Sequence, residues 1–152
     1  MMLAVIRLRG KTKLRHDHKK ALEVLGLHAT NHLALVDDKD LGLVQAVSDY
    51  VAYGPVDAEW LAALLEKRGR LAGNQRLTAE WLASANVKSF SDAANTLMSN
   101  RKAFEATGLK RIFRLGSPRK GLGTGGKKTR VAFKGSLGNW GPKIQQLVYA
   151  MM

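Results

Sequence analysis

The chain has 152 residues and a mass of 16.7 kDa, the size of one ordinary domain. Apolar residues make up 45% of it and only 3 residues are proline, so the chain can bury a core. It contains no cysteine, which excludes disulfides, thiolate metal sites and a cysteine nucleophile. The net charge of +13 predicts a polyanionic partner, with nucleic acid favoured over a membrane surface.

The positive charge is concentrated at the two ends of the chain. Residues 1–20 carry a net charge of +6 and residues 101–152 carry +11, whereas residues 21–100 carry −4. A basic surface that only keeps a protein soluble would spread its lysines more evenly. The pattern therefore favours two polyanion-binding regions separated by an acidic middle.

The first segment alternates apolar and polar residues with the period of a strand. In residues 2–9, Ala4, Ile6 and Leu8 share one face while Arg7 and Arg9 share the other, which predicts a strand with one buried face. Neither a signal-peptide pattern nor an apolar run of about 20 residues is present, so we expect a soluble intracellular protein.

The next elements alternate between helix and strand up to residue 56. We expect a helix over about 17–26, a strand over 32–36, a helix from Asp40 to about Tyr50 and a strand over 51–56. This β-α-β-α-β order predicts a truncated ferredoxin-like core over residues 1–56, with both helices on one face of the sheet.

Residues 57–152 are predicted to be a helical extension of that core. Three short helices begin near Asp57, Thr78 and Ser89 or Ser91, the last running toward Phe104. A basic hairpin over 110–134 would pair strand 110–115 with strand 129–133 around a glycine-rich loop. A final helix from Pro142 carries an apolar stripe that needs a partner, so we expect it to dock on the core. The expected fold class is α+β.

Two groups of cations could bind successive phosphates. The first leaves the opening strand and enters the first helix: Arg7, Arg9, Lys11, Lys13, Arg15, His18, Lys19 and Lys20. The second occupies the predicted hairpin: Lys110, Arg111, Arg114, Arg119, Lys120, Lys127, Lys128, Arg130 and Lys134. Asn31 and His32 add side chains that can hydrogen-bond to base edges or sugars.

No residue pattern predicts an enzyme or a metal site. The glycines of residues 121–126 lack the spacing and the following helix of a P-loop, and the four histidines do not form a ligand pair on one helical face. Asp37, Asp38 and Asp40 suit a turn and a helix cap. We therefore expect no catalysis, no cofactor and no metal. Two alternatives stay open: a small phosphate-ester hydrolase on the ferredoxin-like core, and a free DNA-binding module that uses the 110–134 hairpin as a β-ribbon.

Several separate segments resemble the universal L-thirty family of large-subunit ribosomal proteins. The resemblance rests on residues 5–10, His18-Lys19-Lys20, residues 25–32, residues 42–54, residues 113–121 and residues 135–138. Short bacterial members resemble only about residues 3–56, whereas the longer forms resemble the whole chain. The length and the absence of a long basic N-terminal arm are similar to the archaeal form.

The resemblance implies a structural rRNA-binding protein of the large subunit, located in the cytoplasmic ribosome. It implies contacts with 23S-type rRNA and a position near 5S rRNA, with neighbouring large-subunit proteins as further partners and neither membrane nor DNA. By position, it implies that the following residues face rRNA: Arg9, Lys11, Lys13, Arg15, His18, Lys19, Lys20, Asn31, His32, Ser117, Arg119 and Lys120.

Overall fold

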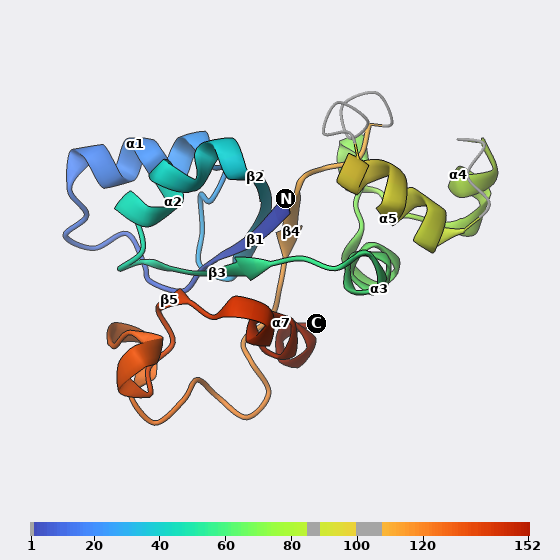
Figure 1. Cartoon of the computed structure of the whole chain (residues 1–152). Helices are drawn as coiled ribbons and strands as arrows, with labels where there is room; N and C mark the ends of the chain where they lie inside the picture. Colours follow the sequence, from blue (N-terminus) through green and yellow to red (C-terminus); the bar gives the residue numbers. More distant parts are fainter. Residues whose placement is uncertain (1, 85–88, 100–107) are drawn as a thin grey trace.

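The computed structural model describes residues 2–84, 89–99 and 108–152 and contains a five-stranded sheet (Figure 1). The strands are β1 Met2–Arg7, β2 His32–Asp37, β3 Val51–Pro55, β4 Ile112–Arg114 and β5 Gly138–Asn139. Their spatial order is β4-β2-β1-β3-β5, and only the β3–β5 pair is parallel. The structure is an α+β fold that contains the expected β-α-β-α-β core.

Strand β1 lies at the centre of the sheet and is buried on both faces. Ile6 pairs with Leu33 on one side and with Ala52 on the other. Ala4, Ile6 and Leu8 belong to one apolar cluster, while Val5 belongs to a second cluster on the opposite face. The prediction of a single buried face was therefore wrong, because helices cover both sides of this strand.

Helices α1 His16–Val24 and α2 Leu41–Ala46 cover one face, as predicted (Figure 1). A short 3-10 turn, η1 Asp38–Asp40, precedes α2. Helix α2 ends earlier than the predicted Tyr50. The backbone carbonyl of Tyr50 instead accepts hydrogen bonds from the amides of Leu8 and Arg9 at 3.1 and 3.2 Å, so this residue belongs to the approach to β3.

The C-terminal helix covers the other face. It comprises the 3-10 turn η5 Gly141–Lys143 and helix α7 Ile144–Met151, whose apolar stripe is fully buried and confirms the predicted docking. Contact with β3 is close, since a Cβ at Gly54 would lie 2.4 Å from the carbonyl oxygen of Gly141. Only glycine fits there without displacing the turn.

The remaining helices lie beyond the end of β3. They are α3 Ala58–Arg68, η2 Ala72–Asn74, α4 Ala79–Ser84 and α5 Phe90–Ser99. Trp60 is 2% exposed within the main core, and the Ser89 hydroxyl caps α5 by accepting the Asp92 amide at 3.2 Å. These starts match the predictions. The predicted continuation to Phe104 lies outside the described residues.

The predicted 110–134 hairpin does not form. Strand β4 pairs with β2, placing Arg114 opposite His32, and residues 129–133 are not a strand. They belong to a compact loop with two 3-10 turns, η3 Gly126–Lys128 and η4 Val131–Phe133. The carbonyl of Thr129 accepts the amides of Ser136 and Leu137, which folds this segment on itself. The open edge of β2 provides the alternative partner for β4.

The sheet combines strands from both predicted segments of the chain. Strands β1 to β3 come from residues 1–56, and β4 and β5 come from residues 57–152. The domain division at residue 56 stays a prediction.

Candidate nucleic-acid interface

The sheet topology brings several basic connections to one end of the sheet. Strands β1 and β4 end there, at Arg7 and Arg114, and strands β2, β3 and β5 begin there. We call this the basic end and define it as residues 8–20, 28–32, 48–50, 114–121 and 123–137. Figure 1 shows the loop before α1 and the turns before β5 at the same end of the sheet, away from α3, α4 and α5.

Arg7 lies under the basic end and is 2% exposed. Its guanidinium donates to the carbonyls of Leu27 at 2.7 Å, Arg9 at 2.9 Å and Gly10 at 3.1 Å. Its own carbonyl accepts the Asn31 amide at 2.7 Å. Burial lowers the pKa of Arg7 from its usual value. The expectation that Arg7 faces RNA is corrected: its position on a doubly covered strand gives it a structural role.

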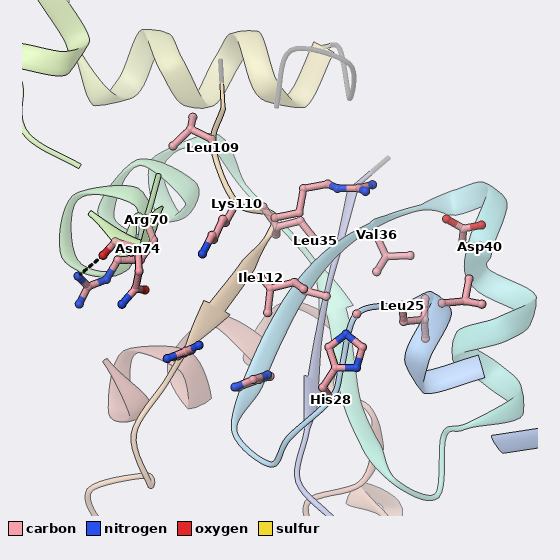
Figure 2. Close-up of a pocket in the computed structure, with 16 residues that line it drawn as sticks. Leu25, His28, Leu35, Val36, Asp40, Arg70, Asn74, Leu109, Lys110 and Ile112 are labelled. Carbon is pink, nitrogen blue, oxygen red and sulfur yellow. Dashed lines mark hydrogen bonds between the residues drawn. The ribbon is translucent and has the colours of Figure 1, made fainter. Parts of the chain in front are cut away.

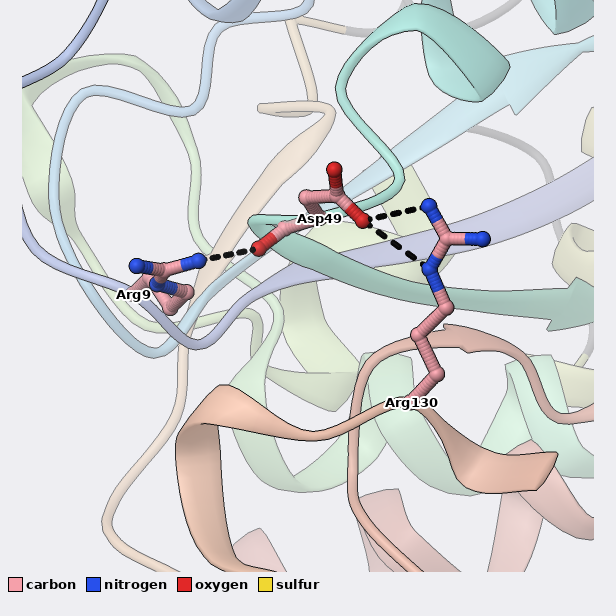
Figure 3. A network of polar contacts seen from close by, with 3 residues as sticks. All are labelled: Arg9, Asp49 and Arg130. Atoms are coloured by element: carbon pink, nitrogen blue, oxygen red, sulfur yellow. Dashed lines mark hydrogen bonds and ion pairs between the residues drawn. The ribbon is translucent and has the colours of Figure 1, made fainter. Parts of the chain in front are cut away.

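Arg9 and Arg130 meet at Asp49 (Figure 3). Arg130 donates to one Asp49 carboxylate oxygen from Nε at 3.0 Å and from Nη2 at 2.7 Å, and Arg9 donates to the Asp49 backbone carbonyl at 3.1 Å. The Arg9 guanidinium also lies 5.0 Å from the centre of the Tyr50 ring, against which the His18 ring packs edge-on at 5.5 Å. The ion pair is half exposed and contributes little stability. Through Asp49, however, Arg9 of the first basic region is connected to Arg130 of the second.

The loop before α1 presents exposed cations. Lys11, Lys13, Arg15, Lys19 and Lys20 are all exposed. Arg15 occupies the N-cap position of α1 without a capping side-chain hydrogen bond. Positive side chains at this position are repelled by the positive end of the helix dipole. A bound anion would reduce that repulsion and the repulsion among the side chains.

Residues 116–121 are anchored through their backbone. The amides of Gly116 and Arg119 donate to the carbonyls of Met151 and Ala150, both at 2.9 Å, which fixes this loop to the end of α7. The side chains of Ser117, Arg119 and Lys120 are exposed. The loop therefore holds its cations outward from a fixed backbone.

Residues 123–137 form the second anchored cationic loop. The Gly125 amide donates to the Lys134 carbonyl at 3.0 Å, and the Thr129 hydroxyl donates to the Gly125 carbonyl at 2.8 Å. Lys127, Lys128 and Lys134 remain exposed. A folded turn replaces the predicted strand, but these cations still face solvent.

Asn31, His32 and Arg114 meet where β2 begins. Arg114 lies opposite His32 in the sheet, and the Leu115 amide donates to the Asn31 carbonyl at 3.0 Å. Burial lowers the pKa of His32 below 6.5, and the positive charges of Arg114, His28 and Arg7 lower it further. The lowered pKa favours the neutral form of the His32 imidazole.

A groove of about 560 Å³ extends along β4 (Figure 2). Its lining includes predicted residues Arg111, Arg114 and His32 together with Arg70 and His28, which had no predicted binding role. The Lys110 amide donates to the Arg70 carbonyl at 3.0 Å and brings Arg70 to the groove. Arg70 lies in the acidic middle of the chain, so no local sequence signal indicates it.

Membrane spans and metal clusters are both absent from the part of the chain that the structure describes. None of its helices is long and apolar enough to cross a membrane. Within the same residues, no three or more histidine, aspartate or glutamate side chains gather as metal ligands.

Replacing Arg7 with methionine should destabilise the fold. Arg7→Met leaves three carbonyls without their charged donor, and we expect the free energy of unfolding to fall by about 2–4 kcal/mol. Urea denaturation measures this change. Arg15→Met, at an exposed position, is the matched control and should change stability by less than about 0.5 kcal/mol. Equal stability of the two variants would refute the structural role of Arg7.

His32 should make the protein less stable as the pH falls. Its pKa is lower in the folded state than in the unfolded state, so the unfolded state binds more protons between the folded pKa and 6.5. Stability should therefore rise with pH across that window, and His32→Gln should flatten the dependence. Unfolding at a series of pH values measures it, and an NMR titration giving His32 a pKa above 6.5 would contradict it.

Comparison with known proteins identifies the family. The model for ribosomal protein L30p/L7e matches residues 3–51. The large ribosomal subunit protein uL30 of Methanococcus vannielii is 37% identical over all of both chains. The uL30 proteins of Methanoculleus marisnigri and Nanoarchaeum equitans are 41% and 34% identical, over 99% and 97% of this chain and 99% and 96% of their own lengths.

These relatives are archaeal and match this chain from end to end, in agreement with the long archaeal-type form. Their family is structural rather than enzymatic, so the prediction that the chain is not an enzyme is confirmed. The chain belongs to the uL30 family of large ribosomal subunit proteins.

Proposed function

We propose that this chain is a structural component of the large ribosomal subunit and binds rRNA through its basic end. The observation that carries the proposal is the convergence of basic segments from residues 9–20 and 114–134 at one end of the sheet. The names of the archaeal relatives support the ribosomal location. The cytoplasmic ribosome is then the place of action.

The proposed contact residues differ in how they would act. Exposed lysines and arginines would neutralise phosphates, and Arg9 and Arg130 would add charge while joining the two regions. Arg7 would hold the backbone of Arg9 and Gly10 in place without contacting RNA. The proposed set combines residues of the basic end with Arg111, which precedes β4: Arg9, Lys11, Lys13, Arg15, His18, Lys19, Lys20, Asn31, His32, Arg111, Arg114, Ser117, Arg119, Lys120, Lys127, Lys128, Arg130 and Lys134.

The rRNA partner would be of the 23S type, with 5S rRNA nearby and other large-subunit proteins as neighbours. The family resemblance supports this choice. Recognition would rest mainly on RNA shape and backbone, because most of the proposed groups are cations rather than base-reading amides. The alternative of a DNA-binding β-ribbon required a 110–134 hairpin, and β4 pairs with β2 instead.

Removing two exposed lysines should weaken rRNA binding in a salt-dependent way. Lys127→Ala with Lys128→Ala should reduce the slope of log affinity against log salt by about two, one for each lost phosphate contact. Filter binding to archaeal 23S-type and 5S rRNA transcripts over a salt series measures the slope for each RNA.

The double variant Lys39→Ala with Lys143→Ala is the charge-matched control. Both lysines are exposed and lie outside the proposed contact set. The control should change the slope of log affinity against log salt by less than about 0.5. An identical loss in both double variants would mean that net charge alone, and not the basic end, determines binding.

A further inference from the structure

The groove along β4 is bounded by parts of the chain that are far apart in sequence. On one side, a Cβ at Gly26 would lie 2.6 Å from Ile112 Cδ1, so the end of α1 packs directly against β4. On the other side, the hydrogen bond from the Lys110 amide to the Arg70 carbonyl holds residues 70–74 beside the chain that leads into β4. Figure 2 shows Arg70 and Lys110 toward one side and Leu25 toward the other. Contacts between distant segments of the chain therefore fix both walls of the groove.

The groove combines an apolar floor with a cationic rim. Buried Leu25, Ala34 and Val36 contribute to the floor. The ionised groups of the lining are four cations and one carboxylate: Arg70, Lys110, Arg111, Arg114 and Asp40. Arg70 is held at the rim by a hydrogen bond of 3.2 Å to the Asn74 carbonyl (Figure 2). The rim favours a ligand with an anionic group, and the floor favours a flat apolar group next to that anion.

Two imidazoles add flat groups that a nucleobase can stack on. His28 is exposed and His32 is partly buried, and both line the groove. The Nδ1 atom of His32 is buried and has no hydrogen-bond partner. Because this atom is closed to solvent, the groove offers its two imidazoles as stacking surfaces and not as base-pairing partners.

A single nucleotide fits these features better than the other anionic partners. The volume lies within the range of small-molecule sites. A duplex keeps its bases stacked and could offer only phosphates, whereas an unpaired base can leave the stack and pack on histidine or arginine. An acidic peptide would use the cations but not the imidazoles. His32 and Arg114 also connect the groove to the basic end.

We propose that the groove along β4 binds one unpaired RNA nucleotide, with its base beside His28, His32 and Ile112 and its phosphate beside Arg70 and Lys110. The proposal rests on the rRNA-binding function proposed above. It adds a contact with single-stranded RNA to an interface otherwise built for backbone phosphates.

The test compares a fluorescent oligouridylate with a mixed-sequence RNA duplex of equal length, using fluorescence anisotropy on the full chain. His28→Ala and Lys110→Ala each alter an exposed groove residue, and Lys143→Ala is the control on the opposite face. We expect each groove variant to lose affinity for the oligouridylate by about fivefold or more, the scale of one lost stacking contact for His28→Ala and of one lost hydrogen bond to a charged group for Lys110→Ala. Affinity for the duplex should change by less than about twofold, as in the control.

The possible results separate this proposal from the broader one. Unchanged oligouridylate affinity in both groove variants overturns the nucleotide site, while rRNA binding that still depends on Lys127 and Lys128 keeps the proposed function. Failure of the unmodified chain to bind either oligouridylate or the rRNA transcripts overturns both. Binding of a polyglutamate peptide that Lys110→Ala abolishes, with oligouridylate binding unaffected, makes the groove a protein-docking site and overturns the nucleotide proposal.

Discussion

The buried guanidinium of Arg7 connects two chain segments that lead into the candidate interface. It donates to carbonyls at Arg9 and Gly10, directly after β1, and at Leu27, shortly before β2. A charged group at 2% exposure would be costly without partners, so these carbonyls must stay within its reach. The basic loop before α1 consequently starts from a fixed point. The charge of Arg7 serves the arrangement of its neighbours rather than contact with a ligand.

The sheet topology brings the two basic segments of the sequence together at one end of the fold. Antiparallel pairing returns the chain to the same end of the sheet before β2 and β3 and after β4, while the parallel β5 begins there. Asp49 then joins Arg9 to Arg130, although the two arginines are 121 positions apart in the sequence. Helices α3, α4 and α5 lie beyond the other end of β3 (Figure 1). A protein with this layout can present cations to RNA while its helical part faces elsewhere.

The sequence was informative where local pattern decides structure and failed where a distant partner decides it. The α7 stripe and the start of α5 follow from apolar spacing and capping, so they were predictable. The prediction of a hairpin was wrong because β4 had two possible partners, residues 129–133 and the edge of β2. The edge of β2 exists only in the assembled sheet. Arg7 was misassigned because alternation cannot tell a solvent-facing side from one covered by another helix. Arg70 reaches the groove through a hydrogen bond with a segment 40 residues away, which spacing does not encode.

We expect the basic end, and not the helical part, to contact rRNA inside the large subunit. Cross-linking within purified archaeal large subunits that carry this chain, followed by mapping of the RNA-linked peptides, tests it directly. We expect cross-links in residues 9–20, 114–121 and 127–134. Cross-links confined to α3, α4 and α5, or sedimentation of the chain apart from the subunit before cross-linking, would contradict it.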